Sequence, residues 1–284
     1  MTTQRVTVRA PAKINWTLDV LGKRPDGYHE IRSIMQTIDV NDTLVFEPAD
    51  ELTITVEGDD GLIDTPREEN LAFRAAELLR GRAGHRAGTH IRLAKGIPVA
   101  AGLGGGSSDA AATLRGLRAL WEVDISDEAL AELGARLGSD VPFFLRGGTA
   151  LVSGRGEIIE PLPDAQAEEV EIAPPPLRVL TDKTTRMYAA LRQEHYTDGS
   201  HTEALADRIR RGEPVRDEDC FNVFEAVLAE VDPKAAAALE AARDSRGRPH
   251  LCGSGPAHFT LGAGGVRTLT VAEATRLSEV SSRG

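Results

Sequence analysis

A glycine-rich stretch at residues 98–108 is the segment of this chain best suited to chemistry. Its four glycines let the backbone curl so that successive N–H groups point inward, and it leads directly into an amphipathic helical pattern that includes Asp109. A helix N-terminus adds free N–H donors and a positive dipole end, so the stretch is suited to hold a polyphosphate. The alternative is a glycine-rich linker, but a linker would not open straight into a helix with Ser at its cap and Asp in its first turn.

The stretch differs from the two common nucleotide-binding loops. A Walker A loop ends in Gly-Lys-Ser/Thr, whereas Gly106 is followed by Ser107 and Ser108. The dinucleotide fingerprint fails as well, because Ser107 stands at its third glycine position. We therefore expect the charge of a bound phosphate to be neutralised by backbone amides, a metal ion and basic residues from elsewhere in the chain.

Two polar residues near the start of the chain share one face of a predicted strand. Residues 6–20 alternate between apolar and polar side chains, as a half-buried strand does. Lys13 and Asn15 therefore point the same way.

An aromatic residue and a histidine follow a predicted turn. Pro25 presets its own backbone angle and Gly27 tolerates a left-handed one, so residues 24–27 form a turn that delivers Tyr28 and His29 just beyond it. The chain has only three tyrosines, which makes this pair a plausible platform for a nucleobase. The alternative is a tyrosine at the rim of a site and a surface histidine.

Asp140 has two possible roles on sequence grounds. It follows a helical pattern that ends at Gly138, and it comes shortly before Pro142. An aspartate in this place is a good N-cap for the next helix, and its carboxylate is also able to accept a proton. The residues alone leave both roles open.

Three motifs, in this order, resemble those of the GHMP kinase family. The family's second motif reads Pro-x-x-x-Gly-Leu-Gly-Ser/Gly-Ser-Ser, and residues 98–108 match it closely. An N-terminal Pro-Ala-Lys-Ile-Asn stands at residues 11–15, and a C-terminal Gly-Ser-Gly-Pro stands at residues 253–256. The resemblance implies a small-molecule kinase that uses ATP as co-substrate together with Mg²⁺.

Within the family, the chain resembles the members that act on a cytidine diphosphate-linked methylerythritol. This narrower resemblance rests on residues 12–15, 23–30, 101–111 and 137–144. It implies transfer of the γ-phosphoryl group of ATP to the 2-hydroxyl of that substrate, in the non-mevalonate route to isoprenoid precursors.

The resemblance also implies roles for single residues. Asp140 would accept the proton of the attacking hydroxyl, and Lys13 would stabilise the developing negative charge. Tyr28 would stack on the cytosine, His29 would bind the edge of the base, and Asn15 would contact the substrate.

The resemblance is weaker in the second half of the chain. A Ser-Thr pair usually precedes a tyrosine there, and Thr184 is the best candidate for the substrate-contacting threonine, with Thr181 and Thr185 as competitors. In the second motif, Ser107, Ser108 or Asp109 could touch Mg²⁺, and the sequence leaves the metal ligands unknown. The residues that would bind ATP are Pro98, Val99, Ala100, Ala101, Gly102, Leu103, Gly104, Gly105, Gly106, Ser107 and Ser108.

The remaining patterns predict a chain of mixed helices and strands. Three consecutive prolines at residues 174–176 stop any helix or central strand, so we place a domain junction there. The resemblance implies the α+β two-domain GHMP kinase fold, with an N-terminal domain at residues 1–160, a C-terminal domain at residues 177–284 and the active site in the cleft between them. Strands are expected at residues 31–40, 43–46, 52–56, 91–93 and 258–261, and helices at residues 70–79, 109–121, 126–137, 184–192, 221–231 and 271–277.

Composition limits the classes of partner. The 284 residues carry 44 acidic and 33 basic side chains, a net charge of −11, which disfavours nucleic-acid binding. Two cysteines, Cys220 and Cys252, are too few for a disulfide scaffold and lack zinc spacing. No segment has the apolar length needed to span a membrane, and the first residues lack a signal peptide's apolar core. We expect a cytoplasmic enzyme with a small-molecule substrate, without nucleic-acid or membrane partners, as a monomer or homodimer.

Two other functions stay open at this point. One is another GHMP small-molecule kinase of the homoserine or mevalonate type, against which the Asp-Gly-Tyr-His segment at residues 26–29 argues. The other is a non-catalytic nucleotide- or sugar-binding relative. Loss of Lys13 or Asp140 would favour that interpretation, and both are present.

Overall fold

The computed structural model describes residues 5–58, 66–85, 88–166, 169–173, 182–243, 247–262, 265–277 and 281–283. The proline run at residues 174–176 and the competing Thr181 lie outside these ranges. The strands are β1 (Arg5–Lys23), β2 (His29–Ala49), β3 (Thr53–Glu57), β4 (Gly88–Ala94), β5 (Thr149–Gly154), β6 (Ile158–Pro161), β7 (Val170–Ala173), β8 (Phe221–Asn222), β9 (His250–Leu251), β10 (His258–Leu261) and β11 (Ser281–Arg283). The helices are α1 (Leu71–Ala83), α2 (Gly105–Leu120), α3 (Asp127–Leu137), α4 (Val141–Arg146), α5 (Lys183–Ala190), α6 (Ser200–Arg210), α7 (Leu228–Val231), α8 (Pro233–Ala241) and α9 (Val271–Leu277).

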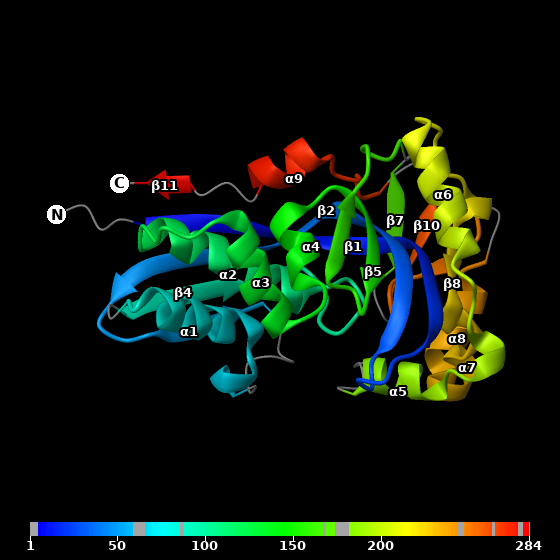
Figure 1. The fold of residues 1–284 in the computed structure, drawn as a ribbon, viewed down its shortest axis with the longest axis horizontal. Coiled ribbons are helices and arrows are strands. Elements are labelled where there is room, and N and C mark those ends of the chain that lie inside the picture. The colour runs from blue at the N-terminus through cyan, green and yellow to red at the C-terminus, as the bar shows by residue number, and fades with distance from the viewer. Residues whose placement is uncertain are drawn as a thin grey trace.

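The long antiparallel pair β1 and β2 runs along the molecule from end to end (Figure 1). The predicted turn at residues 24–27 joins the two strands. The Gly27 N–H donates to the Arg24 carbonyl at 3.1 Å, and Gly27 has a φ of +89°, as the turn requires.

The other strands extend this pair into a mixed sheet. Among the described residues the order is β11-β1-β2-β4-β3, while β5 pairs with β2 and with β6, and β8 lies parallel to β1. A smaller sheet has the order β7-β10-β9. Strands from the last quarter of the chain thus lie beside the first strand.

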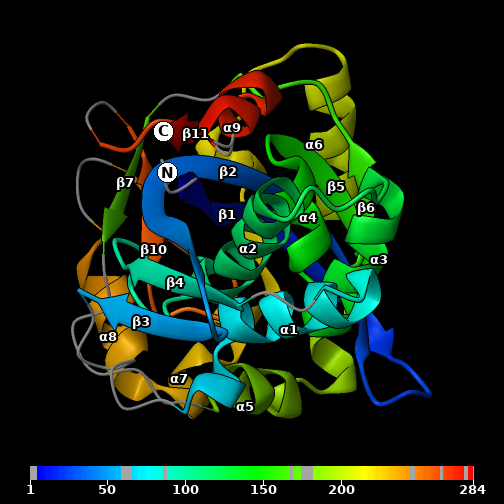
Figure 2. The ribbon, with the colours of Figure 1, turned by 90° about the vertical axis from the view of Figure 1, so that its left-hand side faces the viewer.

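Helices α1 to α4 lie together on one side of the large sheet (Figure 2). Their apolar faces bury the inward side chains of the strands, and α2 comes closest. At Gly116 of α2 an added Cβ would stand 2.3 Å from the ring of Phe46 in β2, so glycine is required for this approach. The side chain of Asn70 caps α1, and Ser126 caps α3, as their sequence patterns predict.

A second group of helices packs at the far end of β1 and β2, where α5, α7 and α8 gather (Figure 1). Leu18 of β1 and Ile31 of β2 share a core with Met187 of α5 and Leu228 of α7. This core places α5 beside the polar residues of β1.

The half-buried pattern expected for β1 holds only at its start, where Arg9 is exposed between buried Val8 and Ala10. From there to Val20 the polar side chains are as deeply buried as the apolar ones: Asn15 is 2% exposed and Asp19 is fully buried. The polar face is covered by the second half of the chain, where Thr202 of α6 hydrogen-bonds to Asp19 Oδ2 at 2.6 Å.

The prediction of two separate strands at residues 31–40 and 43–46 was also wrong, since β2 continues through Asn41 and Asp42. The register with β1 shifts between Pro11 and Ala12, which accommodates the extra residues of β2 as a bulge. The Asp42 carboxylate then accepts hydrogen bonds from the backbone N–H groups of Gly96 and Ile97 at 2.7 and 2.8 Å, so the polar residue is satisfied inside the sheet.

In the second half of the chain the periodicity was only partly informative. The helix expected at residues 221–231 consists of the short strand β8, a 3-10 turn at Val223–Ala226 and the single turn α7. Helices α6 and α8 and strands β5 to β7 were not predicted. The predicted helices at α5 and α9 and the strand at β10 are confirmed.

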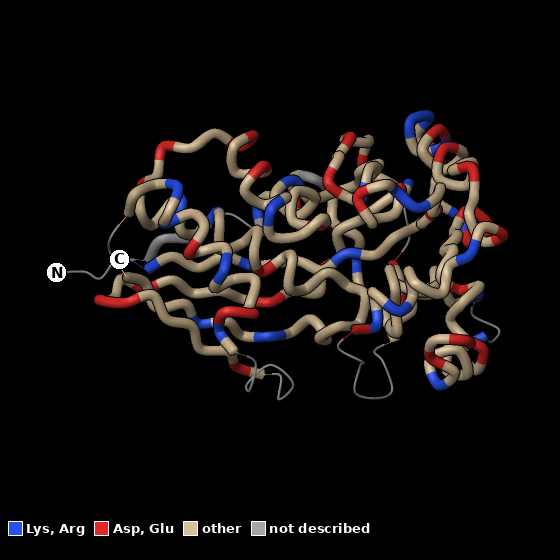
Figure 3. The backbone as a smooth tube through the Cα atoms, turned by 60° about the horizontal axis from the view of Figure 1, so that its bottom comes forward, with Lys and Arg blue, Asp and Glu red and all other residues tan. Residues whose placement is uncertain are grey.

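Charged side chains of both signs are spread over the part of the chain that the structure describes (Figure 3). None of the helices in the described ranges has the length and apolar content to cross a membrane.

Candidate active site

A pocket of about 900 Å³ brings the three sequence motifs together. Its walls are formed by side chains of β1, by the loop before α2, by the residues at the start of α4, by α5 and by the loop at residues 253–254. The predicted site residues that line it are Lys13, Asn15, Tyr28, His29, Pro98, Val99, Ala100, Ala101, Gly102, Gly104, Gly105, Gly106, Ser107, Asp140 and Thr184. Leu103 and Ser108 are buried and do not line it.

The glycine loop opens into α2 one turn earlier than its sequence indicates. Gly104 occupies the N-cap position with a φ of +76°, and the helix begins at Gly105, so the expected serine cap was wrong. The first intrahelical bond runs from the Ser108 N–H to the Gly104 carbonyl at 3.0 Å. The N–H groups of Gly105, Gly106 and Ser107 come before this bond and therefore have no acceptor within the helix. Such N–H groups at a helix N-terminus can bind an anion.

Lys95 is a site residue that sequence reasoning missed. Its ammonium is buried between Asp42 and Asp109, with Asp109 Oδ2 at 2.8 Å, and it lies 3.4 Å from where a Cβ on Gly105 would stand. Burial opposes its charge, but the two carboxylates outweigh that effect and raise the pKa of Lys95. Burial raises the pKa of Asp109 to about 8, because one lysine cannot compensate two buried carboxylates fully.

The lysine count is the signal that could have found it. The chain has five lysines against a much larger number of arginines, and four of the five, Lys13, Lys23, Lys95 and Lys183, line the pocket. Lys234 is exposed. A compact ammonium on a flexible stem fits a crowded phosphate site where a planar guanidinium does not.

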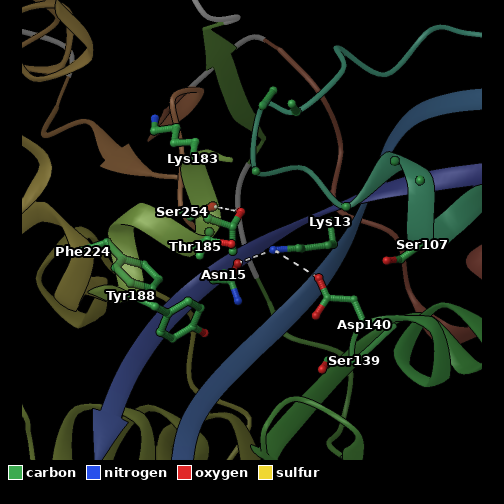
Figure 4. Close-up of a pocket in the computed structure, with 18 of the residues that line it drawn as sticks. Lys13, Asn15, Ser107, Ser139, Asp140, Lys183, Thr185, Tyr188, Phe224 and Ser254 are labelled. Carbon is green, nitrogen blue, oxygen red and sulfur yellow. Dashed lines mark hydrogen bonds and ion pairs between the residues drawn. The ribbon is translucent and has the colours of Figure 1, made fainter. Parts of the chain in front are cut away.

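Lys13 and Asp140 face each other across the pocket (Figure 4). Lys13 Nζ lies 4.0 Å from Asp140 Oδ2 and donates to Asn15 Oδ1 at 2.6 Å. The Lys13 side chain is 5% exposed and that of Asp140 is 29% exposed, so the lysine is held by protein while the carboxylate reaches the open pocket.

Asp140 does occupy the N-cap position of α4, but its side chain makes no capping hydrogen bond to the described residues of that helix. Its backbone angles, φ −81° and ψ −11°, are already helical, whereas a capping residue is normally extended. The carboxylate is therefore directed at Lys13 rather than used by the helix.

The third motif completes the surroundings of Lys13. The lysine stem runs between two glycines, because a Cβ on Gly104 would stand 3.1 Å from Lys13 Cγ and one on Gly253 would stand 3.0 Å from Lys13 Nζ. Asn222 holds this loop by donating to the carbonyls of Leu251 and Gly253, each at 2.8 Å. Both glycines have positive φ, so a side chain at either would be strained as well as crowded.

Thr184 lies in the pocket at the start of α5. Its hydroxyl is 2.8 Å from that of Ser254 in the third motif, while Thr185 also lines the pocket. The arrangement joins α5 to the glycine loop at residues 253–256.

Aromatic side chains gather at the end of the pocket near the β1–β2 turn. The ring of His29 stacks on Tyr188, with centroids 4.9 Å apart, and Phe224 meets Tyr188 edge-on. Tyr28 is 50% exposed, with the guanidinium of Arg155 4.8 Å from its ring centre. Tyr188, the tyrosine that follows Thr184 in the chain and that was not predicted as a site residue, thus lines the pocket.

Burial sets the protonation of these groups. Partial burial, and more weakly Lys23, lowers the pKa of His29, so its imidazole is neutral at neutral pH. Burial, with a smaller contribution from Asp140, raises the pKa of Tyr188, which stays a neutral phenol.

The described residues hold no group of three His, Cys, Asp or Glu side chains that could bind a metal ion. Of the three candidate Mg²⁺ contacts, Ser108 Oγ donates to the Pro11 carbonyl at 2.6 Å and Asp109 is paired with Lys95. Ser107 lines the pocket, and no described residue hydrogen-bonds to its hydroxyl. Of the three candidates, Ser107 is therefore the one whose side chain is not already bonded to a described residue.

Comparison with known proteins agrees with this geometry. Residues 70–148 match the family model described as the GHMP kinases N terminal domain. The 4-diphosphocytidyl-2-C-methyl-D-erythritol kinase of Pelotomaculum thermopropionicum is 44% identical over 262 residues, which is 91% of this chain and 89% of the relative. The enzyme of the same name from Dehalococcoides mccartyi is 40% identical over 90% of this chain and 89% of its own length.

Solved structures give the same result. A crystal structure of 4-(cytidine 5'-diphospho)-2C-methyl-D-erythritol kinase superposes with a TM-score of 0.74 at 36% identity, covering 91% of this chain and 90% of that one. A homoserine kinase from Cytophaga hutchinsonii has a TM-score of 0.71 at 18% identity over 100% of this chain and 94% of its own, which shows the shared fold alone. The chain therefore belongs to the family of 4-diphosphocytidyl-2-C-methyl-D-erythritol kinases within the GHMP kinases, and has their α+β fold.

Proposed function

We propose that this protein transfers the γ-phosphoryl group of ATP to the 2-hydroxyl of 4-diphosphocytidyl-2-C-methyl-D-erythritol. The observation that carries the proposal is the pair of Lys13 and Asp140, 4.0 Å apart in a pocket that the glycine loop also lines. It is supported by relatives that carry this enzyme's name and match nearly the whole chain.

In the proposed reaction the substrate hydroxyl gives its proton to the Asp140 carboxylate while its oxygen forms a bond to the γ-phosphorus of ATP. The bond between that phosphorus and the β,γ-bridging oxygen breaks, and ADP leaves. Lys13 stabilises the negative charge that spreads over the phosphoryl oxygens, and the first N–H groups of α2 hold the remaining phosphates. Asp140 is positioned to act as the base because neither α4 nor a second cation among the described residues uses its carboxylate.

Mg²⁺ is the proposed metal, and it would neutralise the charge of the ATP phosphates when bound. The residues present fit a metal carried by the phosphates, with the Ser107 hydroxyl as the protein group near it. Lys95 lies beside the first turn of α2, 3.4 Å from where a Cβ on Gly105 would stand, but Asp42 and Asp109 balance its charge there.

We propose that the cytosine lies at the aromatic end of the pocket. His29 and Tyr188 stack too closely to admit a base between them, so the base would lie against the exposed ring of Tyr28. A neutral imidazole offers one donor and one acceptor, which suits the edge of cytosine, where an amino group and acceptors lie side by side. Asn15 and Thr184, which both line the pocket, would contact the part of the substrate that carries the hydroxyl.

The two-domain division at residues 1–160 and 177–284 is also a proposal. It is supported by the pocket, which takes Lys13 and Asp140 from the first part and Thr184 and Ser254 from the second. Limited proteolysis near the proline run would test it. A cytoplasmic location and a monomeric or homodimeric state stay predictions, to be tested by fractionation and by sedimentation.

The test of the proposed function is a comparison of substrates. The protein is incubated with ATP and Mg²⁺ together with the cytidylyl substrate, homoserine or mevalonate, and ADP release is followed. We expect turnover with the cytidylyl substrate alone. Turnover with one of the other alcohols and none with the cytidylyl substrate would overturn the proposal.

A further inference from the structure

Strand β1 has a β-bulge immediately after Lys13 and Asn15, two polar residues that line the pocket. Asn15 pairs with Met35 of β2 and Thr17 pairs with Ile34, so Trp16 is the extra residue. Side chains take over part of the hydrogen bonding there: the Ile34 N–H donates to Thr17 Oγ1 at 3.1 Å, and the Thr17 carbonyl accepts from Ser33 Oγ at 2.6 Å.

The second of these bonds decides how Ser33 hydrogen-bonds to its other neighbour. A serine hydroxyl has one proton, and a carbonyl oxygen can only accept, so the proton of Ser33 goes to Thr17. Ser33 is fully buried. Its oxygen is therefore left as an acceptor, and it accepts from Asn15 Nδ2 at 2.7 Å.

The orientation of the Asn15 amide follows from this. With Nδ2 turned to Ser33, Oδ1 faces Lys13, whose ammonium donates to it at 2.6 Å. An ammonium has only donors, so an amide rotated by half a turn would set an NH₂ group against a positive charge. The hydrogen bonds to Ser33 and to Lys13 thus favour the same orientation of the Asn15 amide.

Ser33 itself lies outside the pocket. It is absent from the residues that line the cavity, whereas Asn15 and Lys13 are among them. Of its two side-chain hydrogen-bond partners, Asn15 lines the pocket and Thr17 does not, so we expect an effect of Ser33 on the reaction to pass through Asn15.

We propose that Ser33 is a positioning residue for phosphoryl transfer. By holding the Asn15 amide in one orientation, it supplies the acceptor that keeps the Lys13 ammonium 4.0 Å from Asp140, between the two glycine loops. The inference rests on the proposed function and deepens it, because it explains how a lysine on a flexible stem is aimed at the transferred group.

The kinetic test uses Ser33→Ala with Ser33→Thr as the variant that keeps the hydroxyl. Loss of one buried hydrogen bond that aims a catalytic group should lower kcat about tenfold, while the KM for ATP stays within about twofold. Ser33→Thr should recover most of the lost kcat. A merely structural role would reduce stability and leave kcat per folded molecule unchanged, and that result would overturn the proposal.

A double-variant cycle tests whether Ser33 acts through Asn15. In an Asn15→Ala background the further change Ser33→Ala should alter kcat by less than about twofold, because the amide that Ser33 orients is gone. A full tenfold loss in that background would contradict the proposed route. Thr89→Ala is the matched control: it removes another buried hydroxyl, bound to the indole of Trp121 and not lining the pocket, and should leave kcat at the wild-type value.

A crystal structure of Ser33→Ala separates this inference from the proposed function. We expect the 2.6 Å bond between Lys13 and Asn15 to be lost or the amide to be rotated. Unmoved side chains would overturn the positioning role even if the enzyme reaction is as proposed, and displaced side chains would support it even if the true substrate differs. If Ser33→Ala fails to fold, Ser33→Cys keeps the volume with a weaker acceptor, and the same comparisons apply.

Discussion

Replacing Asp140 by Asn and by Ala separates its two possible roles. Its carboxylate accepts no hydrogen bond from α4 among the described residues, and Oδ2 lies 4.0 Å from Lys13 Nζ. Asn caps a helix about as well as Asp, whereas Ala costs about 1 kcal/mol, so a true cap would make the Ala variant less stable than the Asn variant by that amount. Because the cap bond is missing, we expect their free energies of unfolding to differ by less than about 0.5 kcal/mol.

Both variants lose the negative charge of residue 140, so we expect the same loss of kcat in each. Two unit charges 4.0 Å apart attract by about 4 kcal/mol at an effective dielectric constant of about 20, and the exposure of Asp140 to solvent lowers that value. Loss of a positioned general base lowers kcat by about 10²- to 10⁴-fold. The KM for ATP should change by less than about threefold, because neither variant touches the glycine loop.

The assay combines ADP release, for kcat and KM, with urea unfolding monitored by far-UV circular dichroism. Ser126 provides the matched control, since its Oγ accepts from the Ala129 N–H at 3.2 Å. There the Ala variant should be about 1 kcal/mol less stable than the Asn variant, with kcat unchanged. An Asp140→Asn enzyme with wild-type kcat, or an Ala variant weakened by the full value of a cap, would refute the reasoning.

Two more predictions concern the groups around the phosphate loop. Gly253→Ala places a Cβ 3.0 Å from Lys13 Nζ at a φ of +53°, so we expect a loss of about 1–2 kcal/mol in urea unfolding and a fall in kcat; a variant with unchanged kcat would contradict the tight fit. Asp109→Asn should flatten the pH dependence of stability. Burial raises the pKa of Asp109 to about 8, so the folded protein keeps a proton that the unfolded chain releases near pH 4, and its free energy of unfolding falls as the pH rises between about 4 and 8. Urea unfolding at pH 5 and pH 8 measures this fall, and an equal fall in the Asn variant would assign it to another group.

Local chemistry made part of this protein predictable. The turn at residues 24–27 follows from Pro25 and Gly27, and the starts of α1 and α3 follow from Asn70 and Ser126, whose side chains bond to amides two or three residues away. The glycine loop before α2 was predictable for the same reason, since a curled backbone needs only neighbouring residues, but the start of the helix at Gly105 and its glycine cap were not.

Contacts between residues that are far apart in the sequence could not be predicted from local sequence patterns. Periodicity predicted a half-buried β1, and nothing near Asp19 indicates that Thr202 of α6 covers it. For the same reason, the sequence did not predict the ion pairs of Lys95 with Asp42 and Asp109 or the stacking of His29 on Tyr188. Burial and pKa depend on what packs around a group, and those neighbours come from other elements.

Asp140 shows the division most clearly. Its position between Gly138 and Pro142 was enough to place it at the start of a helix, because helix caps depend on the types of neighbouring residues. Its role depends on where a carboxylate points, and only the packing of β1 against the two glycine loops, with Lys13 held between Gly104 and Gly253, provides the charge that faces it. Residue types and spacing thus settled which groups are available for chemistry, while long-range packing, which brings residues 13, 140 and 253 into one pocket, settled which of them act on one another.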